Sequence, residues 1–147
     1  MNIRSEWEST PNGRSIVTLV TFRVEDVWKG SLGAVTQLEF MGGEIGDIGL
    51  RVEGSPVFKP GQRDVLFVTS TVRAVSPLVG FMHGRMHIER DRVSSVDRVR
   101  TFDGRALGSV AQIGPQRAAP SLASITPMRL AEFESAVRSR IGALRQR

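Results

Sequence analysis

The two histidines are the first residues that could do chemistry, because the chain contains no others. His83 and His87 flank Arg85 in the segment "PLVGFMHGRMHIER". On a helix, histidines four residues apart can share one zinc ion. This segment alternates polar and apolar residues as a strand does, and on a strand the two histidines would lie about 13 Å apart. Two nitrogens bound to one zinc must lie within about 4 Å of each other. The pattern therefore predicts no metal and no cofactor here.

The same alternation predicts a candidate binding surface. Phe81, His83, Arg85 and His87 occupy every second position, so they would share one face of a strand covering residues 77–90. The simplest interpretation of such a row is a solvated polar face. The functional interpretation is a shallow site for an anionic ligand or a protein, with these four residues as its contacts.

Catalytic arrangements have little support in the sequence. The absence of cysteine removes thiolate nucleophiles, thiolate metal sites and disulfides. No serine lies in a nucleophile-elbow context. We therefore expect a protein that is not an enzyme. A hydrolase is the least favoured alternative, and it would require a buried cluster of carboxylate and histidine side chains.

The elements that would position these residues are mostly strands. Apolar and β-branched stretches predict strands at residues 16–28, 35–40, 64–69, 77–90 and 99–102. The pattern breaks near Asp26, which indicates a bulge, and Pro11-Asn12-Gly13 marks a turn. The glycines of "GGEIGDIG" lack the spacing and the following helix of a phosphate-binding loop, so we expect a turn there. Phe58 is the expected inward anchor of the loop that follows.

The last part of the chain has a different pattern. Small residues and two prolines predict a linker at residues 109–125. A helix follows at residues 126–147, with Thr126 as its cap and Pro127 at its first position. Apolar residues recur there at steps of three and four: Leu130, Phe133, Val137, Ile141 and Leu144. We expect this stripe to pack on the β domain or on a partner, a second copy of the chain included.

The charge is unevenly distributed. Residues 1–75 carry 8 basic and 9 acidic groups (−1), and residues 76–147 carry 12 and 6 (+6). A basic half attracts nucleic acid, although these arginines are interleaved with acidic residues. Binding of single strands needs aromatic platforms on a basic groove, and Phe81 is the one phenylalanine on a polar strand face. Single-stranded nucleic-acid binding is therefore the alternative function. No apolar run approaches the length of a membrane span.

The order of the strand and turn motifs carries a resemblance. "VTLVTFRVEDVWKG", "LEFMGGEIGDIGLRVEGSPVFKPGQRDVLFV" and "PLVGFMHGRMHIERD" resemble a group of poorly characterised bacterial domains, often exported, over about residues 15–92. These look like small closed barrels of the oligonucleotide/oligosaccharide-binding (OB) or netrin-module type. The resemblance implies a mainly β fold, with an antiparallel barrel at residues 1–108 and the C-terminal helix added.

The same resemblance bears on function and location. It implies no catalytic residues, and it implies export to the cell envelope, although no signal peptide is visible at the start of the chain. The group has a further first strand, for which "NIRSEWES" is too short. Netrin-type protease inhibitors act through a cysteine that this chain lacks. We therefore expect a non-catalytic binding module whose partner is a protein or a small anionic ligand.

Overall fold

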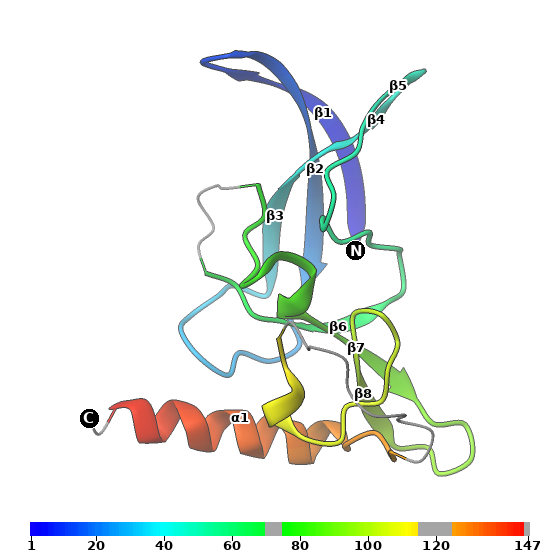
Figure 1. Cartoon of the computed structure of the whole chain (residues 1–147), viewed down its shortest axis with the longest axis vertical. Coiled ribbons are helices and arrows are strands. Elements are labelled where there is room, and N and C mark those ends of the chain that lie inside the picture. Colours follow the sequence, from blue (N-terminus) through cyan, green and yellow to red (C-terminus); the bar gives the residue numbers. More distant parts are fainter. Residues whose placement is uncertain (70–74, 115–124, 146–147) are drawn as a thin grey trace.

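The computed structural model describes residues 1–69, 75–114 and 125–145. It is a mainly β structure with three separate antiparallel sheets and one C-terminal helix (Figure 1). The first sheet has the order β1 (Asn2–Thr10), β2 (Gly13–Arg23), β3 (Val35–Met41). The second is a hairpin of β4 (Gly43–Ile45) and β5 (Ile48–Leu50). The third has the order β6 (Arg63–Leu66), β7 (Arg85–Arg90), β8 (Asp97–Thr101). No ladder among these described strands closes a barrel.

Two short 3-10 helices and one α-helix complete the described chain. They are η1 (Phe81–Gly84), η2 (Val110–Gln112) and α1 (Leu130–Arg145). We call β1–β5 with the side chains packed on them the upper lobe, and β6–β8 with η2 and α1 the lower lobe. Figure 1 shows the two lobes at opposite ends of the long axis, with α1 lying across the far end of the lower lobe.

The first strand of the upper lobe is longer than the sequence predicts. β1 and β2 pair without a break from Asn2↔Thr21 to Thr10↔Gly13, across the predicted turn at Pro11 and Asn12. A strand therefore occupies residues 2–10, where the sequence predicts none. β1 is rich in polar side chains because only one of its edges is paired, so its sequence carries little of the apolar signal of a buried strand.

The strand predicted over residues 16–28 ends earlier, at Arg23. The Val24 amide donates to the carbonyl of Ala34, which closes a loop before β3. Beyond it Trp28 leaves the sheet, and its ring centroid lies 5.8 Å from that of Phe133 on α1. Packing of Trp28 in the lower lobe, and no bulge, explains why the alternation stops near Asp26.

The glycine-rich segment forms the β4–β5 hairpin. Gly46 has a φ of 59° at its tip, as the predicted turn requires. Gly43 has a second role, because a Cβ there would clash with the hydroxyl groups of Ser5 and Thr18. The β4 backbone therefore lies directly on the β1–β2 hairpin, which a side chain at residue 43 would prevent.

The upper lobe has its own apolar core. Its buried members are Val20, Leu38, Phe40, Phe58 and Leu78. Phe58 comes from the loop before β6 and is buried as predicted, with its ring centroid 5.0 Å from Phe40 and 5.2 Å from Phe22. A loop residue therefore supplies the centre of this core, and its edge-on contact with Phe22 and tilted contact with Phe40 fix its position.

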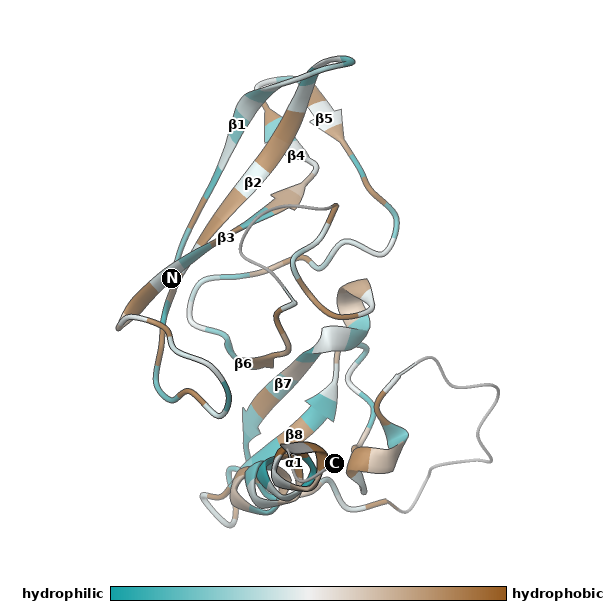
Figure 2. Ribbon diagram, turned by 90° about the vertical axis from the view of Figure 1, so that its left-hand side faces the viewer, coloured by the Kyte–Doolittle hydropathy of each residue, from teal (hydrophilic) through white to brown (hydrophobic). Residues whose placement is uncertain are grey.

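The lower lobe has a separate core between a sheet and a helix. Its buried members are Met86, Val99, Leu107, Phe133 and Val137. The register pairs Ile88 with Val99, so one face of the sheet is apolar and α1 covers it. Figure 2 shows α1 end-on beside β8.

The C-terminal helix forms, but it begins at Leu130. Thr126 and Pro127 are not its cap and first residue. Met128 instead bonds in strand fashion to Val99 and Leu107, which holds the chain extended up to residue 129. Within the stripe Phe133 and Val137 are buried, Leu130 and Ile141 are partly buried, and Leu144 is exposed.

The first residues of the predicted linker, 109–114, pack against the lower core. Ser109 and Gln112 form a reciprocal capping box around η2, and Val110 and Ile113 pack on the core. The rest of the predicted linker, residues 115–124, lies outside the described residues.

The strand predicted over residues 77–90 is two elements. Gly80 and Phe81 have φ values of 61° and 57°, and two successive left-handed residues cannot continue a strand. The chain turns through η1, and β7 begins only at Arg85. Gly84 permits the turn, since a Cβ there would collide with the backbone of Val79.

Candidate functional site

The four predicted binding residues do not share one strand face. Phe81 and His83 lie on η1, and Arg85 and His87 lie on β7. The structure therefore divides them between an exposed turn and a buried cluster. We call residues 79–83 the Phe81 turn, and we treat the two parts separately.

The buried part is a cluster of Asp64, Arg85 and His87. The register of β6 and β7 places Asp64 opposite His87 and Leu66 opposite Arg85, so the three polar side chains share one face. Oδ1 of Asp64 accepts from Nε of Arg85 at 3.1 Å and contacts Nδ1 of His87 at 2.7 Å. Oδ2 accepts from Nη2 of Arg85 at 3.1 Å. Only 2% of the Asp64 side chain and 4% of the Arg85 side chain are exposed.

The remaining contacts of Arg85 reach the loop that carries Phe58. Nη1 donates to the carbonyl of Val57 at 2.6 Å, and Nη2 donates to Oε1 of Gln62 at 2.9 Å. The guanidinium also stacks on Phe58, 4.2 Å from the ring centroid. A buried charge is tolerated only when it is paired and hydrogen-bonded, and here it is both. The cluster therefore fastens a strand of the lower lobe to the core of the upper lobe.

His87 has half of the geometry of a catalytic triad. A carboxylate on Nδ1 orients the imidazole of a general base, whose Nε2 must be open to the reacting group. Nε2 of His87 instead lies 3.0 Å from the carbonyl oxygen of Phe102. Both ring nitrogens are therefore already in contact with oxygen atoms of the chain. Asp64 is buried, but 26% of the His87 side chain is exposed and both of its nitrogens are occupied, so the geometry is that of a structural bridge.

The exposed part is the Phe81 turn. Phe81 is 44% exposed and Val79 is 50% exposed, on either side of Gly80. A bulky residue with positive φ is a backbone outlier, and such outliers persist only where the surrounding structure enforces them. His83 completes the turn, with its ring edge-on to Phe102 at 4.9 Å.

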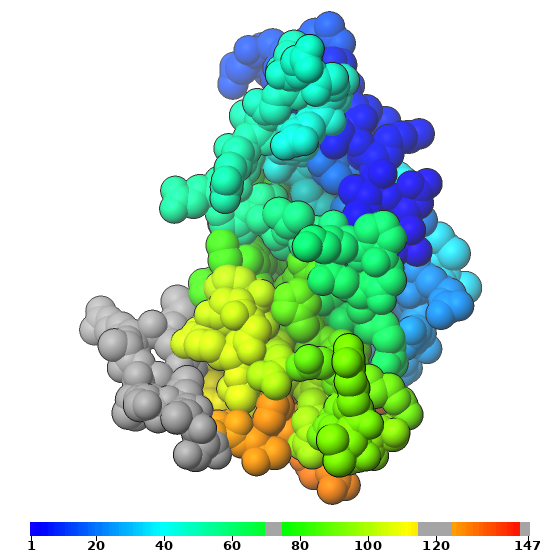
Figure 3. All heavy atoms as spheres, turned by 90° about the vertical axis from the view of Figure 1, so that its right-hand side faces the viewer, coloured from blue at the N-terminus to red at the C-terminus, as the bar shows by residue number. Residues whose placement is uncertain are grey.

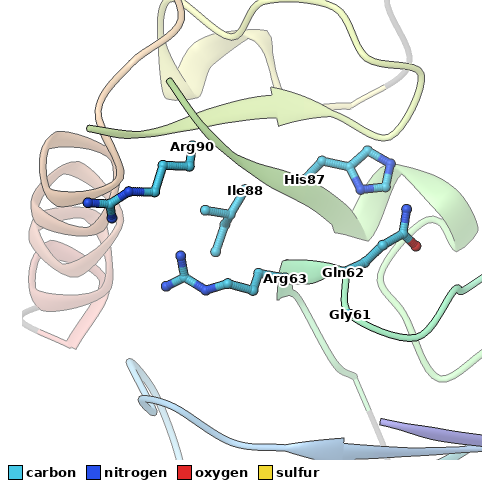
Figure 4. Close-up of a pocket in the computed structure, with 6 residues that line it drawn as sticks. All are labelled: Gly61, Gln62, Arg63, His87, Ile88 and Arg90. Carbon is cyan, nitrogen blue, oxygen red and sulfur yellow. The ribbon is translucent and has the colours of Figure 1, made fainter. Parts of the chain in front are cut away.

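A shallow pocket of about 380 Å³ lies beside the buried cluster (Figure 4). It is lined by Gly61, Gln62, Arg63, His87, Ile88 and Arg90. Figure 4 shows Arg63 and Arg90 at one end of it and His87 and Gln62 at the other, so the polar groups do not converge.

The two arginines of the pocket are already paired. Asp97 accepts from Arg63 at 2.7 Å and from Arg90 at 3.3 Å, and Glu25 accepts from Arg63 at 2.9 Å. The hydrogen bond from Arg63, with the charge of Arg90 nearby, lowers the pKa of Asp97 below its ordinary value. With its cations neutralised in this way, the pocket is a poor site for an anion.

Ion pairing extends over the basic half of the chain. In the described part, Arg98 pairs with Asp91, Arg100 with Glu89, Arg105 with Asp103, and Arg138 with Glu134 and Asp26. The interleaving of arginines and acidic residues in the sequence therefore becomes pairing in space. These pairs place carboxylates between the arginines, so the paired arginines do not form a continuous basic groove.

The sequence did not point to Asp64 or Phe102. Asp64 reads as a surface residue at the start of an apolar strand, and only the strand register reveals that it faces Arg85 and His87. Phe102 contributes a carbonyl and a ring edge from just beyond β8. An available signal was the alternation of Asp64 and Leu66, which places both on the face opposite Val65.

Among the described residues no helix is long and apolar enough to cross a membrane. Comparison with known proteins adds no family assignment: the chain matches no protein-family model, no curated protein and no solved structure.

Proposed function

We propose that this chain is a non-catalytic interaction module that recognises a protein partner through the Phe81 turn. One observation carries the proposal. Phe81 is held in a strained left-handed conformation while 44% of its surface stays exposed. Strain of this kind costs about 1–3 kcal/mol and tends to occur where function requires it. The exposed part of the ring is free to contact a partner, and such contact would use the strained conformation.

The buried cluster supports this proposal because it fixes the chain directly after the Phe81 turn. Gly84 and Arg85 follow the turn directly, and the guanidinium of Arg85 is fixed by Asp64, Gln62 and Val57. A turn that is fixed at its base loses little conformational freedom on binding. The apolar side chains of Val79 and Phe81 would then enter a pocket of the partner as a preformed pair.

A small anionic ligand is a weaker candidate. Arg85 was the cation expected to bind it, and Arg85 is buried against Asp64. His87 is bonded at both ring nitrogens. Neither group is directed toward solvent in a way that would bind a free anion.

Single-stranded nucleic acid is the second candidate, because the rings of His83 and Phe102 lie 4.9 Å apart and the exposed Phe81 is two residues from His83 in the chain. Such rings can serve as a stacking platform. The arginines nearest to Phe102 in the sequence, Arg100 and Arg105, are each paired with a carboxylate. These ion pairs reduce the number of cations beside the rings that could contact phosphates.

The proposal includes the resemblance to small OB or netrin-type barrels. The mainly β architecture and the glycine turns of residues 15–92 favour it. The three sheets leave the closed barrel as a proposal only. Recognition through the Phe81 turn does not depend on closure, because the turn is held by β6 and β7.

A peptide-display selection on the folded chain tests the proposal. We expect enriched peptides to carry apolar side chains and to bind Phe81→Gly at least about tenfold more weakly, a loss of about 1.4 kcal/mol. Val93→Ala is the matched control, because Val93 is also exposed, at 97%, and lies outside the turn. Peptides that bind Phe81→Gly as well as the original chain, or a selection without enrichment, would contradict the proposal.

A fluorescence titration with short oligonucleotides distinguishes nucleic-acid binding from recognition of a protein partner. Nucleic-acid binding should be detectable at low salt and should weaken steeply as salt rises. Binding that follows this pattern and is lost in Phe81→Gly would replace the protein partner by nucleic acid. We expect no oligonucleotide binding at low salt.

A further inference from the structure

The outer edge of β1 is an uncovered strand edge. β1 lies at the end of the sheet order β1-β2-β3, and it pairs only with β2 among the described residues. The β4–β5 hairpin contacts β1 through Ser5, on one face of the strand. Figure 3 shows the first residues, in dark blue, along one open flank of the upper lobe.

This edge lacks most of the devices that prevent pairing. Proteins usually interrupt an exposed edge with proline, with a bulge or with a very short strand. β1 is nine residues long, contains no proline or glycine, and pairs with β2 in an unbroken register. Its only protection is charge, supplied by Arg4, Glu6 and Glu8.

Those charges complement a second copy of the same strand in one register. In an antiparallel pair with a two-fold axis perpendicular to the sheet, the residue on the axis meets itself. With Ser5 on the axis, Arg4 lies opposite Glu6 of the second copy, twice. On the other face Ile3 lies opposite Trp7 of the second copy, where Trp7 is 38% exposed in the single chain.

The neighbouring registers are worse. With Glu6 on the axis, two glutamates face each other, and with Arg4 on the axis, two arginines do. Like charges directly opposite destabilise a strand pair, and opposite charges stabilise it. The Glu6 register also pairs Arg4 with Glu8 of the second copy, but only the Ser5 register combines ion pairs and cover for Trp7 with no like charges opposite each other. Arg14 already stacks on one side of the Trp7 ring, at 4.8 Å, and this contact holds the ring in place for a second copy.

We propose that two copies of this chain associate through β1, antiparallel about an axis at Ser5. The two β1-β2-β3 sheets then form one continuous six-stranded sheet. The interface is distinct from the Phe81 turn, and a dimer would present two such turns. It also differs from the expected use of α1, whose Phe133 and Val137 are buried within the chain.

Single cysteines test the register, since the chain has none of its own. In Ser5→Cys the two thiols would meet at the axis, where the Cα separation of about 4.5–5.5 Å suits a disulfide. In Ser9→Cys they would lie eight residues apart along the pair, about 26 Å. Mild oxidation should therefore give a covalent dimer, at twice the 16.1 kDa of the chain, for Ser5→Cys alone. Equal cross-linking of both variants, or of neither, would overturn the register.

A charge swap tests the ion pairs by sedimentation velocity. Arg4→Glu and Glu6→Arg should each raise the dimer dissociation constant at least about tenfold, because each turns two attractive contacts into repulsive ones. The double variant Arg4→Glu/Glu6→Arg should return to within about threefold of the original chain. Arg140→Glu on the exposed side of α1 makes the same charge change as Arg4→Glu and should have no effect.

Thermal melts distinguish the loss of the dimer in these variants from a failure to fold. Within one chain Nη2 of Arg4 already pairs with Oε2 of Glu6 at 2.9 Å, and the two side chains are 65% and 45% exposed. A pair this exposed contributes little to stability, so thermal melts of all four variants should stay close to that of the original chain. A chain that is monomeric up to about 200 µM would be too weak a dimer to matter and would overturn the proposal. So would a double variant that does not recover, since its charges are complementary again.

Discussion

The upper and lower lobes bury apolar side chains in different ways. The upper lobe packs one face of a long-stranded sheet against loop residues, chiefly Phe58 and Leu78. The lower lobe packs a short-stranded sheet against α1, and Phe133 there has no exposed surface at all. A loop can cover a sheet when one aromatic ring fills the centre, whereas short strands need a helix that spans them. The comparison indicates that the lower lobe depends on few, deeply buried contacts from distant parts of the chain.

The two lobes also differ in how their polar groups are used. In the lower lobe the polar face of the sheet is occupied by Asp64, Arg85 and His87. The guanidinium of Arg85 lies on the Phe58 ring of the upper core. The lobes therefore share one polar joint between two apolar cores, and a change in the joint should affect both.

Removal of the Phe133 ring should have the largest effect on stability. Phe133→Ala leaves a cavity beneath the rings of Trp28 and Phe67, so we expect a loss of about 3–5 kcal/mol in the free energy of unfolding. Denaturant titration measures it. Leu144→Ala on the same helix is the control, since Leu144 is 72% exposed, and should cost less than about 0.5 kcal/mol. Equal losses would refute the central place of Phe133 in the lower lobe.

Loss of the Asp64 charge at the polar joint should have the second-largest effect on the free energy of unfolding. Asp64→Asn leaves the buried guanidinium of Arg85 without its carboxylate, and we expect a cost of about 3 kcal/mol. Because both cores meet at this point, the fluorescence of Trp28 and of Trp7 should report unfolding at the same reduced denaturant concentration. Asp47→Asn at the tip of the glycine hairpin is the control. A shift reported by one lobe only would show that the joint does not couple them.

A methyl group on Gly43 tests the upper lobe by itself. Its φ of 145° is strained for other residues, and the new Cβ would press on Ser5 and Thr18. We expect Gly43→Ala to cost about 1–3 kcal/mol through overpacking. Gly46→Ala has open space around its Cβ and should show only the smaller cost of positive φ, up to about 1 kcal/mol. Thermal melts that rank the two variants in the opposite order would contradict the close packing of β4 on the β1–β2 hairpin.

Acid should weaken the contact between Asp97 and Arg63, near the joint. This is the smallest of the four expected effects on stability. The pKa of Asp97 is lowered in the folded chain, chiefly by the hydrogen bond from Arg63. A depressed carboxylate pKa stabilises the fold above its unfolded value of about 4, and the gain is lost as pH falls through the folded value. We expect a loss of up to about 1 kcal/mol below pH 4. Unfolding titrations at pH 6 and pH 3 should differ less for Asp97→Asn than for the original chain.

Features set by local pattern could be predicted from the sequence. The mainly β class, the C-terminal helix, the turn at Pro11 and Asn12, and the burial of Phe58 all follow from residue periodicity and turn chemistry. β1 could not, because its stability comes from pairing with β2 and not from its own residues.

The candidate site was predictable only in part. Arg85 and His87 do share a strand face, but their partner Asp64 becomes visible only with the register of β6 and β7. The alternation predicts Phe81 and His83 on the same strand. Residue propensities do not predict that a phenylalanine adopts a positive φ, as Phe81 does. Gly84 permits that turn, because a Cβ there would collide with the backbone of Val79. The polar joint and the exposed turn are thus products of the assembled fold.

The two cores have consequences for the order in which a ribosome completes them. All buried members of the upper core precede residue 80, whereas the lower core requires Phe133 and Val137. Because synthesis proceeds from the N-terminus, the upper core can assemble while the lower sheet still waits for its helix. During that interval the apolar face of β6–β8 has no cover, and nascent chains would be most vulnerable to aggregation there. We expect translational stalling between residues 90 and 130 to trap a species with a folded upper lobe and an open lower sheet.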